Sequence, residues 1–178
     1  FRRELQLTKP VTRARAYVSG LGLYEMSING KRVGDRVLEP ASTDYTKRVL
    51  YSTYDVTGLL TEGANAVGIS VGPGWFGGLA ALYGANGLWD GLARTRVKVV
   101  VDHPDGSSST LITDPSWKVG RGATLVGAAT DKGVAETYDA RLATPGWNAA
   151  GFDDSAWKNA VVDARPAAGR GLDRLGGG

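Results

Sequence analysis

Short segments in which apolar and polar residues alternate, separated by Gly, Pro and Asn turns, run through most of this chain. An alternation with a period of two is typical of β-strands that bury one face. The dipeptide Asn29-Gly30 predicts a hairpin turn, because the central residues of such a turn need positive φ angles. The pattern predicts strands at residues 1–7, 13–19, 23–33 (a hairpin), 49–56, 65–71, 93–101 and 109–113.

The second half of the chain has a weaker pattern. Strand-like segments follow at residues 114–119 and 136–142 and within 145–162, and a Gly/Ala-rich connection precedes residue 136. After the Gly-rich residues 72–78, the stretch up to residue 90 alternates small apolar residues with Gly and predicts a long irregular loop, and loops of this length often carry function. No segment predicts a convincing amphipathic helix. We therefore expect an all-β fold, a jelly-roll β-sandwich of two antiparallel sheets.

The length and the Gly content support this fold class. A chain of 178 residues can bury one sizeable core, and its 26 glycines suit a fold with many tight turns. The end of the chain is polar and Gly-rich and offers little to bury. We expect one β-sandwich domain over residues 1–165 and a flexible tail or linker over residues 166–178.

Charge and cysteine content exclude several classes of function. The 21 basic and 18 acidic residues are scattered along the chain, whereas a nucleic-acid-binding protein concentrates its basic residues on one surface. The chain has no Cys, which excludes disulfides, thiolate metal sites and a Cys nucleophile but leaves the compartment open. No apolar stretch approaches the ~18 residues of a membrane-spanning helix. We expect neither nucleic acid nor a membrane as a partner.

Several motifs occur together in a characteristic order. They are Phe1-Arg2-Arg3-Glu4-Leu5, residues 24–35, Thr43-Asp44-Tyr45, residues 50–57, residues 136–141, Pro145-Gly146-Trp147 and residues 151–158. In this order they resemble the N-terminal β-sandwich domain of bacterial α-L-rhamnosidases. That family hydrolyses its substrate in a separate helical-barrel domain, so the resemblance implies a non-catalytic module. Some domains of this kind bind terminal L-rhamnose with the help of calcium, and others are structural.

The resemblance thus predicts a carbohydrate-binding module that recognises terminal L-rhamnose or a related deoxysugar, assisted by Ca²⁺ and accessory to an α-L-rhamnosidase. The alternative is a structural accessory domain that packs against the catalytic domain of the parent glycosidase and binds no sugar. A stand-alone hydrolase is a weaker hypothesis. The pair Asp153-Asp154 does not suit two carboxylates on either side of a glycosidic bond and resembles the capped start of a helical turn.

Asp44 is the main candidate for a sugar or metal contact. A carboxylate on a loop is a suitable ligand for Ca²⁺, but an Asp in a turn also commonly bonds its own backbone. The resemblance favours the sugar site for Asp44. Asn86 is a second candidate calcium ligand. Tyr45 stands where some rhamnose-binding relatives have Asn, and it could stack on a sugar but cannot supply an amide oxygen.

Aromatic and polar residues beside the long Gly-rich loop complete the predicted site. Trp75 and Trp89 flank this loop and could provide apolar platforms for a deoxysugar. Asn86 and Asp90 could form directional hydrogen bonds with its hydroxyl groups, and Glu136 is a further candidate contact. For each of the two tryptophans, loop-stabilising packing is the alternative. The remaining tryptophans are predicted to be packing anchors rather than ligands, namely Trp117, Trp147 and Trp157.

Overall fold

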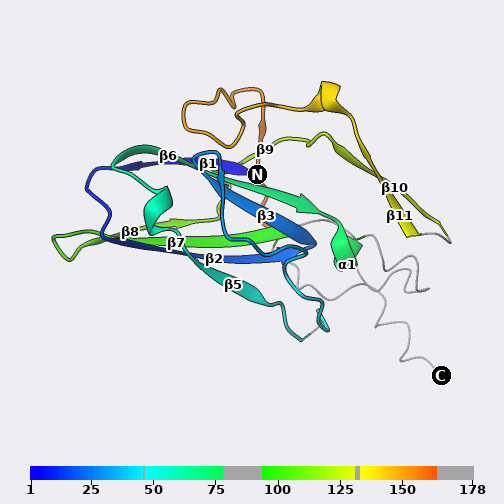
Figure 1. The fold of residues 1–178 in the computed structure, drawn as a ribbon, viewed down its shortest axis with the longest axis horizontal. Helices are drawn as coiled ribbons and strands as arrows, with labels where there is room; N and C mark the ends of the chain where they lie inside the picture. The colour runs from blue at the N-terminus through cyan, green and yellow to red at the C-terminus, as the bar shows by residue number, and fades with distance from the viewer. Residues whose placement is uncertain (46, 78–93, 131–132, 164–178) are drawn as a thin grey trace.

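The computed structural model describes residues 1–45, 47–77, 94–130 and 133–163, and two antiparallel sheets pack face to face in it (Figure 1). The larger sheet has the order β12-β9-β1-β6-β3-β4, with β1 Arg2–Leu7, β3 Leu23–Ile28, β4 Lys31–Arg32, β6 Gly63–Gly72, β9 Lys118–Val119 and β12 Lys158–Asn159. The smaller sheet has the order β5-β2-β7-β8, with β2 Arg13–Leu21, β5 Tyr51–Asp55, β7 Arg94–Asp102 and β8 Ser108–Ile112. The predicted all-β sandwich is confirmed.

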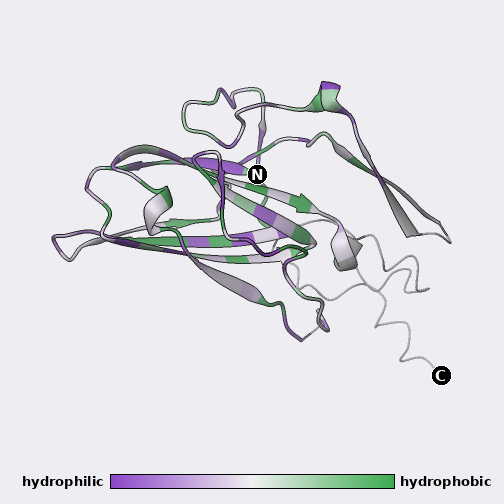
Figure 2. Cartoon of the chain, in the orientation of Figure 1, coloured by the Kyte–Doolittle hydropathy of each residue, from purple (hydrophilic) through white to green (hydrophobic). Residues whose placement is uncertain are grey.

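The core lies between the two sheets and follows from the alternation along the strands. In β7, Val97, Val99 and Val101 are at most 1% exposed, while the residues between them point to the outer face. Successive side chains of a strand point to opposite faces, so this pattern buries one face of each sheet. Figure 2 shows the same alternation of hydrophobic and hydrophilic segments along the smaller sheet. Trp117 is 1% exposed and belongs to this core, as predicted.

The predicted hairpin turn is also confirmed. Asn29 and Gly30 have φ angles of 51° and 77° and connect β3 to β4. The segment after residue 56 forms a single 3-10 turn, η1 (Thr57–Leu59), and a one-turn helix, α1 (Gly74–Gly77), follows β6. In the described part of the chain, no helix has the length and apolar character needed to cross a membrane.

The second half of the chain differs from the predicted pattern. The Gly/Ala-rich connection forms a strand, β10 (Thr124–Thr130), which pairs with β11 (Gly133–Tyr138) as a separate hairpin. The predicted strand at residues 136–142 ends at Tyr138, and η3 (Ala140–Leu142) follows. Residues 145–157 are loop and turn that cross the outer face of the larger sheet (Figure 1). Contacts with other segments, rather than local alternation, determine the conformation of these residues. The predicted tail, residues 166–178, lies outside the described residues.

Candidate functional site

The loop of Asp44 lies beside α1. The rings of Tyr45 and Phe76 meet edge to face, with centroids 5.4 Å apart and an interplanar angle of 89°. Tyr45 is 6% exposed and Phe76 1% exposed, and together with Leu21 they form a small apolar cluster separate from the main core. Asp44 and Trp75 directly precede these two rings in the chain, so the contact brings the Asp44 turn next to α1, where the second predicted connection begins.

A tight turn holds Asp44 at the surface. Its backbone carbonyl accepts hydrogen bonds from the N–H groups of Lys47 and Arg48, both 2.9 Å long. Its side chain is 49% exposed, and one carboxylate oxygen lies 3.3 Å from the Lys47 ammonium group. The hydroxyl of Thr43 donates to the carbonyl of Arg48, which closes the turn. This arrangement presents one accessible carboxylate, a group that can bind a cation or accept hydrogen bonds from sugar hydroxyls.

The environment of Tyr45 does not match its predicted role. The ring packs against Phe76 in the apolar cluster, and burial raises the pKa of its hydroxyl group. A ring that is only 6% exposed cannot stack on a sugar, so this part of the prediction is corrected. The polar neighbours of Tyr45 in the sequence suggested an exposed ring, whereas a contact with residue 76 determines its burial. Tyr45 instead fixes the position of the Asp44 turn.

The other predicted site residues fall into two groups. Trp75 lies in α1, but its side chain is outside what the structure describes, and Asn86, Trp89 and Asp90 lie outside the described residues. Glu136 is exposed on β11 and lines a cleft whose lining residues do not include Asp44. Within the described ranges, no three His, Cys, Asp or Glu side chains gather as a metal site. Of the two predicted calcium ligands, Asp44 lies in the part of the chain that the structure describes, and Asn86 lies outside it.

The cleft at Glu136 was not predicted from the sequence. It has a volume of about 870 Å³ and lies between the outer face of β3 and β6, the β10–β11 hairpin and residues 143–148. Trp147 and Trp157 line it, with stacked rings whose centroids are 6.2 Å apart. Each ring covers a glycine: a Cβ atom on Gly68 would lie 2.8 Å from Trp147, and one on Gly120 would lie 2.6 Å from Trp157. Both tryptophans are half-buried anchors, in line with the prediction, but they also form a wall of the cleft.

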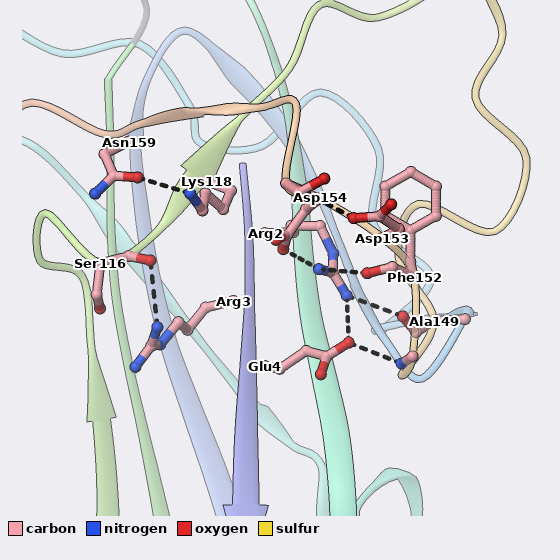
Figure 3. Close-up of polar contacts among 12 residues, drawn as sticks. Arg2, Arg3, Glu4, Ser116, Lys118, Ala149, Phe152, Asp153, Asp154 and Asn159 are labelled. Carbon is pink, nitrogen blue, oxygen red and sulfur yellow. Dashed lines mark hydrogen bonds and ion pairs between the residues drawn. The ribbon is translucent and has the colours of Figure 1, made fainter.

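Arg2 attaches the segment that carries these tryptophans to β1 (Figure 3). Its guanidinium group is 1% exposed, lies 2.7 Å from Glu4 and forms an ion pair with Asp154. It also donates hydrogen bonds to the carbonyls of Ala149 and Phe152, at 3.1 and 3.3 Å. The predicted helical turn after Asp153 is a hydrogen-bonded turn, and Asp154 is instead a partner of this buried arginine.

The fold is an antiparallel β-sandwich domain. Side chains that can bind a ligand lie on its loops and on the outer face of the larger sheet. The family model of the α-L-rhamnosidase N-terminal domain matches residues 9–170, and the chain belongs to this family.

Similar proteins support this assignment. An α-L-rhamnosidase of Streptomyces avermitilis is 43% identical over 149 residues, which are 84% of this chain and 14% of that protein. A solved α-L-rhamnosidase from Dictyoglumus thermophilum matches with a TM-score of 0.82 and 39% identity, over 94% of this chain and 18% of that one. The Streptomyces avermitilis α-L-rhamnosidase complexed with L-rhamnose matches with a TM-score of 0.81 and 36% identity, over 94% and 16%. The chain thus spans less than a fifth of these proteins.

Proposed function

We propose that this domain is a non-catalytic carbohydrate-binding module, accessory to an α-L-rhamnosidase, that recognises terminal L-rhamnose or a related deoxysugar. The observation that carries the proposal is the contact of Tyr45 with Phe76, which brings the Asp44 turn next to α1. Family membership supports the sugar, because the matched relatives are α-L-rhamnosidases. The small share of their length that the chain spans supports a role outside the hydrolytic step.

The chemistry of the Asp44 turn suits a sugar with neighbouring hydroxyl groups. The half-exposed carboxylate accepts hydrogen bonds from such hydroxyls or contributes to a calcium site that binds them, with Asn86 as the second ligand in this proposal. Trp75 and Trp89 are the proposed platforms for the methyl group of the deoxysugar. A single monosaccharide offers few atoms, so we expect a dissociation constant in the micromolar to millimolar range.

Calorimetry with L-rhamnose tests this proposal. We expect binding heat in the presence of Ca²⁺, weaker binding with a chelator, and loss of binding in Asp44→Ala. Asp105→Ala is a matched control, because Asp105 is also a half-exposed turn aspartate that pairs with a lysine, Lys9. Absence of heat and of any thermal shift with or without calcium would refute the proposal, as would normal binding by Asp44→Ala.

A second candidate function is a structural domain that packs against the rest of the parent enzyme. The observation in its favour is a depression of about 850 Å³ on the outer face of the smaller sheet. Large apolar side chains line it while remaining exposed, with Tyr51 at 67%, Val161 at 90% and Val162 at 65%. Exposed apolar patches of this kind often mark interaction surfaces. A domain that binds no sugar but stabilises the remainder of its parent enzyme when added in trans would favour this function.

A further inference from the structure

The cleft over the larger sheet has the form of a ligand site that is separate from the Asp44 turn. Its volume of about 870 Å³ falls within the range of about 300–1,000 Å³ that is usual for small-molecule sites. The outer faces of β3 and β6 form one side. Glu25 and Ser70 lie opposite each other there in the strand register, and both residues are exposed. The β10–β11 hairpin and residues 143–148 form other parts of the lining.

The wall formed by the tryptophans is held rigidly. Trp147 and Trp157 lie against Gly68 and Gly120, where a Cβ atom would overlap the indole rings. The side-chain amide of Asn148 donates to the Ser27 hydroxyl at 3.0 Å, and the carbonyl of Asn148 accepts from a backbone N–H of the β3–β4 turn. A site held in place before the ligand arrives loses less entropy on binding.

The β11 strand presents an aromatic ring and a carboxylate on the same side of this cleft. Glu136 and Tyr138 are two residues apart in β11 and therefore share a face, and both line the cleft. Tyr138 is 66% exposed, which is unusual for a large ring that packs as an anchor. Among the residues that the structure describes, neither Glu136 nor Arg121 has an ion-pair partner, although both line the same cleft.

The balance of charge in the cleft indicates the kind of ligand. Two carboxylates, Glu25 and Glu136, and one guanidinium group, Arg121, line it, and Glu25 is paired with Arg32 at 3.4 Å. The carboxylates disfavour an anionic ligand, and the guanidinium group disfavours a cationic one. Carboxylate and guanidinium groups do, however, suit the hydroxyl groups of a sugar as acceptors and donors. An aromatic ring buries the apolar face of a pyranose at little entropic cost.

We propose that this cleft is a second carbohydrate-binding site, which takes a neutral pyranose unit with its apolar face on Tyr138 and its hydroxyl groups at Glu136 and Arg121. The site goes beyond the function proposed above, because Asp44 is not among the residues that line it. Two separate sugar sites on one domain would allow it to hold a glycan at two points, which raises the overall affinity without new contacts at either site.

Nuclear magnetic resonance titration of the ¹⁵N-labelled chain tests the second site. The probe is rutinose, a neutral disaccharide of L-rhamnose and D-glucose, and the readout is the indole N–H signals of Trp147 and Trp157. We expect both signals to shift in the wild type. Tyr138→Ala and Glu136→Gln should each weaken this binding about three- to tenfold. Tyr51→Ala is the matched control and should bind normally, because Tyr51 is 67% exposed on the other sheet.

The outcomes separate this proposal from the first. In Asp44→Ala the rutinose-dependent shifts of the two indole signals should remain, even if binding of L-rhamnose at the Asp44 turn is lost. Failure of L-rhamnose to bind at Asp44 would refute only the first proposal. The second site is refuted if neither indole signal shifts at rutinose concentrations on the order of 10 mM, or if Tyr138→Ala binds like the wild type. Tighter binding of digalacturonate than of rutinose would overturn the assignment to a neutral sugar.

Discussion

Replacing Arg2 with Ala should destabilise the domain and release residues 149–154 from β1. The guanidinium group contacts four partners (Figure 3). Glu4 lies on its own strand, and the others are distant in the sequence, namely Ala149, Phe152 and Asp154. Its carbon atom also lies 5.3 Å from the centre of the Phe152 ring, within range of a cation–π interaction. Removal of the side chain leaves the carboxylates of Glu4 and Asp154 without their cation.

The structure allows the size of this effect to be estimated. Loss of one partner from a buried ion pair costs about 3–5 kcal/mol. The side chain of Arg2 is 1% exposed, but those of Glu4 and Asp154 are 40% and 25% exposed, so water replaces part of the lost interaction. The Nε atom of Arg2 is buried and has no hydrogen-bond partner among the described residues, which further reduces the stability that the wild type gains from this side chain. We therefore expect the lower end, about 3 kcal/mol, a large fraction of the 5–15 kcal/mol that is typical of a domain.

Urea denaturation of Arg2→Ala and of the wild type measures this loss, with an unchanged m-value as the sign of a pure stability effect. Hydrogen exchange shows where the loss acts. Arg2→Ala should accelerate exchange of the Gly151 amide, which donates to Glu4, more than it accelerates exchange of the β7 amides. Arg2→Lys keeps the charge but not the forked geometry, so its stability should lie between the two. A loss below about 1 kcal/mol for Arg2→Ala, the value of a surface pair, would refute the reasoning.

Two further substitutions test packing and electrostatics. Gly120→Ala places a Cβ atom 2.6 Å from the Trp157 ring and should lower the free energy of unfolding by about 1–3 kcal/mol, measured by thermal unfolding. Gly122→Ala is the control and should have little effect, because the nearest atom to its Cβ would be 3.9 Å away. Equal effects of the two variants would contradict the packing described. A hydrogen bond from Lys9, and further ones from Ser107, hold the pKa of Asp105 well below 3.8, so the stability from this group is present above pH 3.8 and is lost as the pH falls through the folded-state pKa. Lys9→Ala should raise the pKa of Asp105 in a carboxyl-carbon NMR titration, and an unchanged value would exclude the lysine as its cause.

The candidate site could be predicted only in part. The Asp44 turn and α1 do lie side by side, as a site built from both connections requires. The burial of Tyr45 was not predictable, because its neighbours in the sequence are polar and its partner, Phe76, lies beyond two strands, β5 and β6. The cleft at Tyr138 also escaped prediction, since its sides come from strands and loops that are far apart in the sequence.

By itself, the sequence determined most strands of the two packed sheets, but not the β10–β11 hairpin. A strand that buries one face must place apolar residues at every second position, so Val97, Val99 and Val101 identify both the strand and its buried side. Only the tertiary structure decided the burial of Arg2 and the position of Trp147 and Trp157. Arg2 and Asp154 are 152 residues apart, and the two tryptophans rest on glycines of other segments. Such contacts leave no periodic pattern in the sequence, because they depend on how distant segments pack once the sheets have formed.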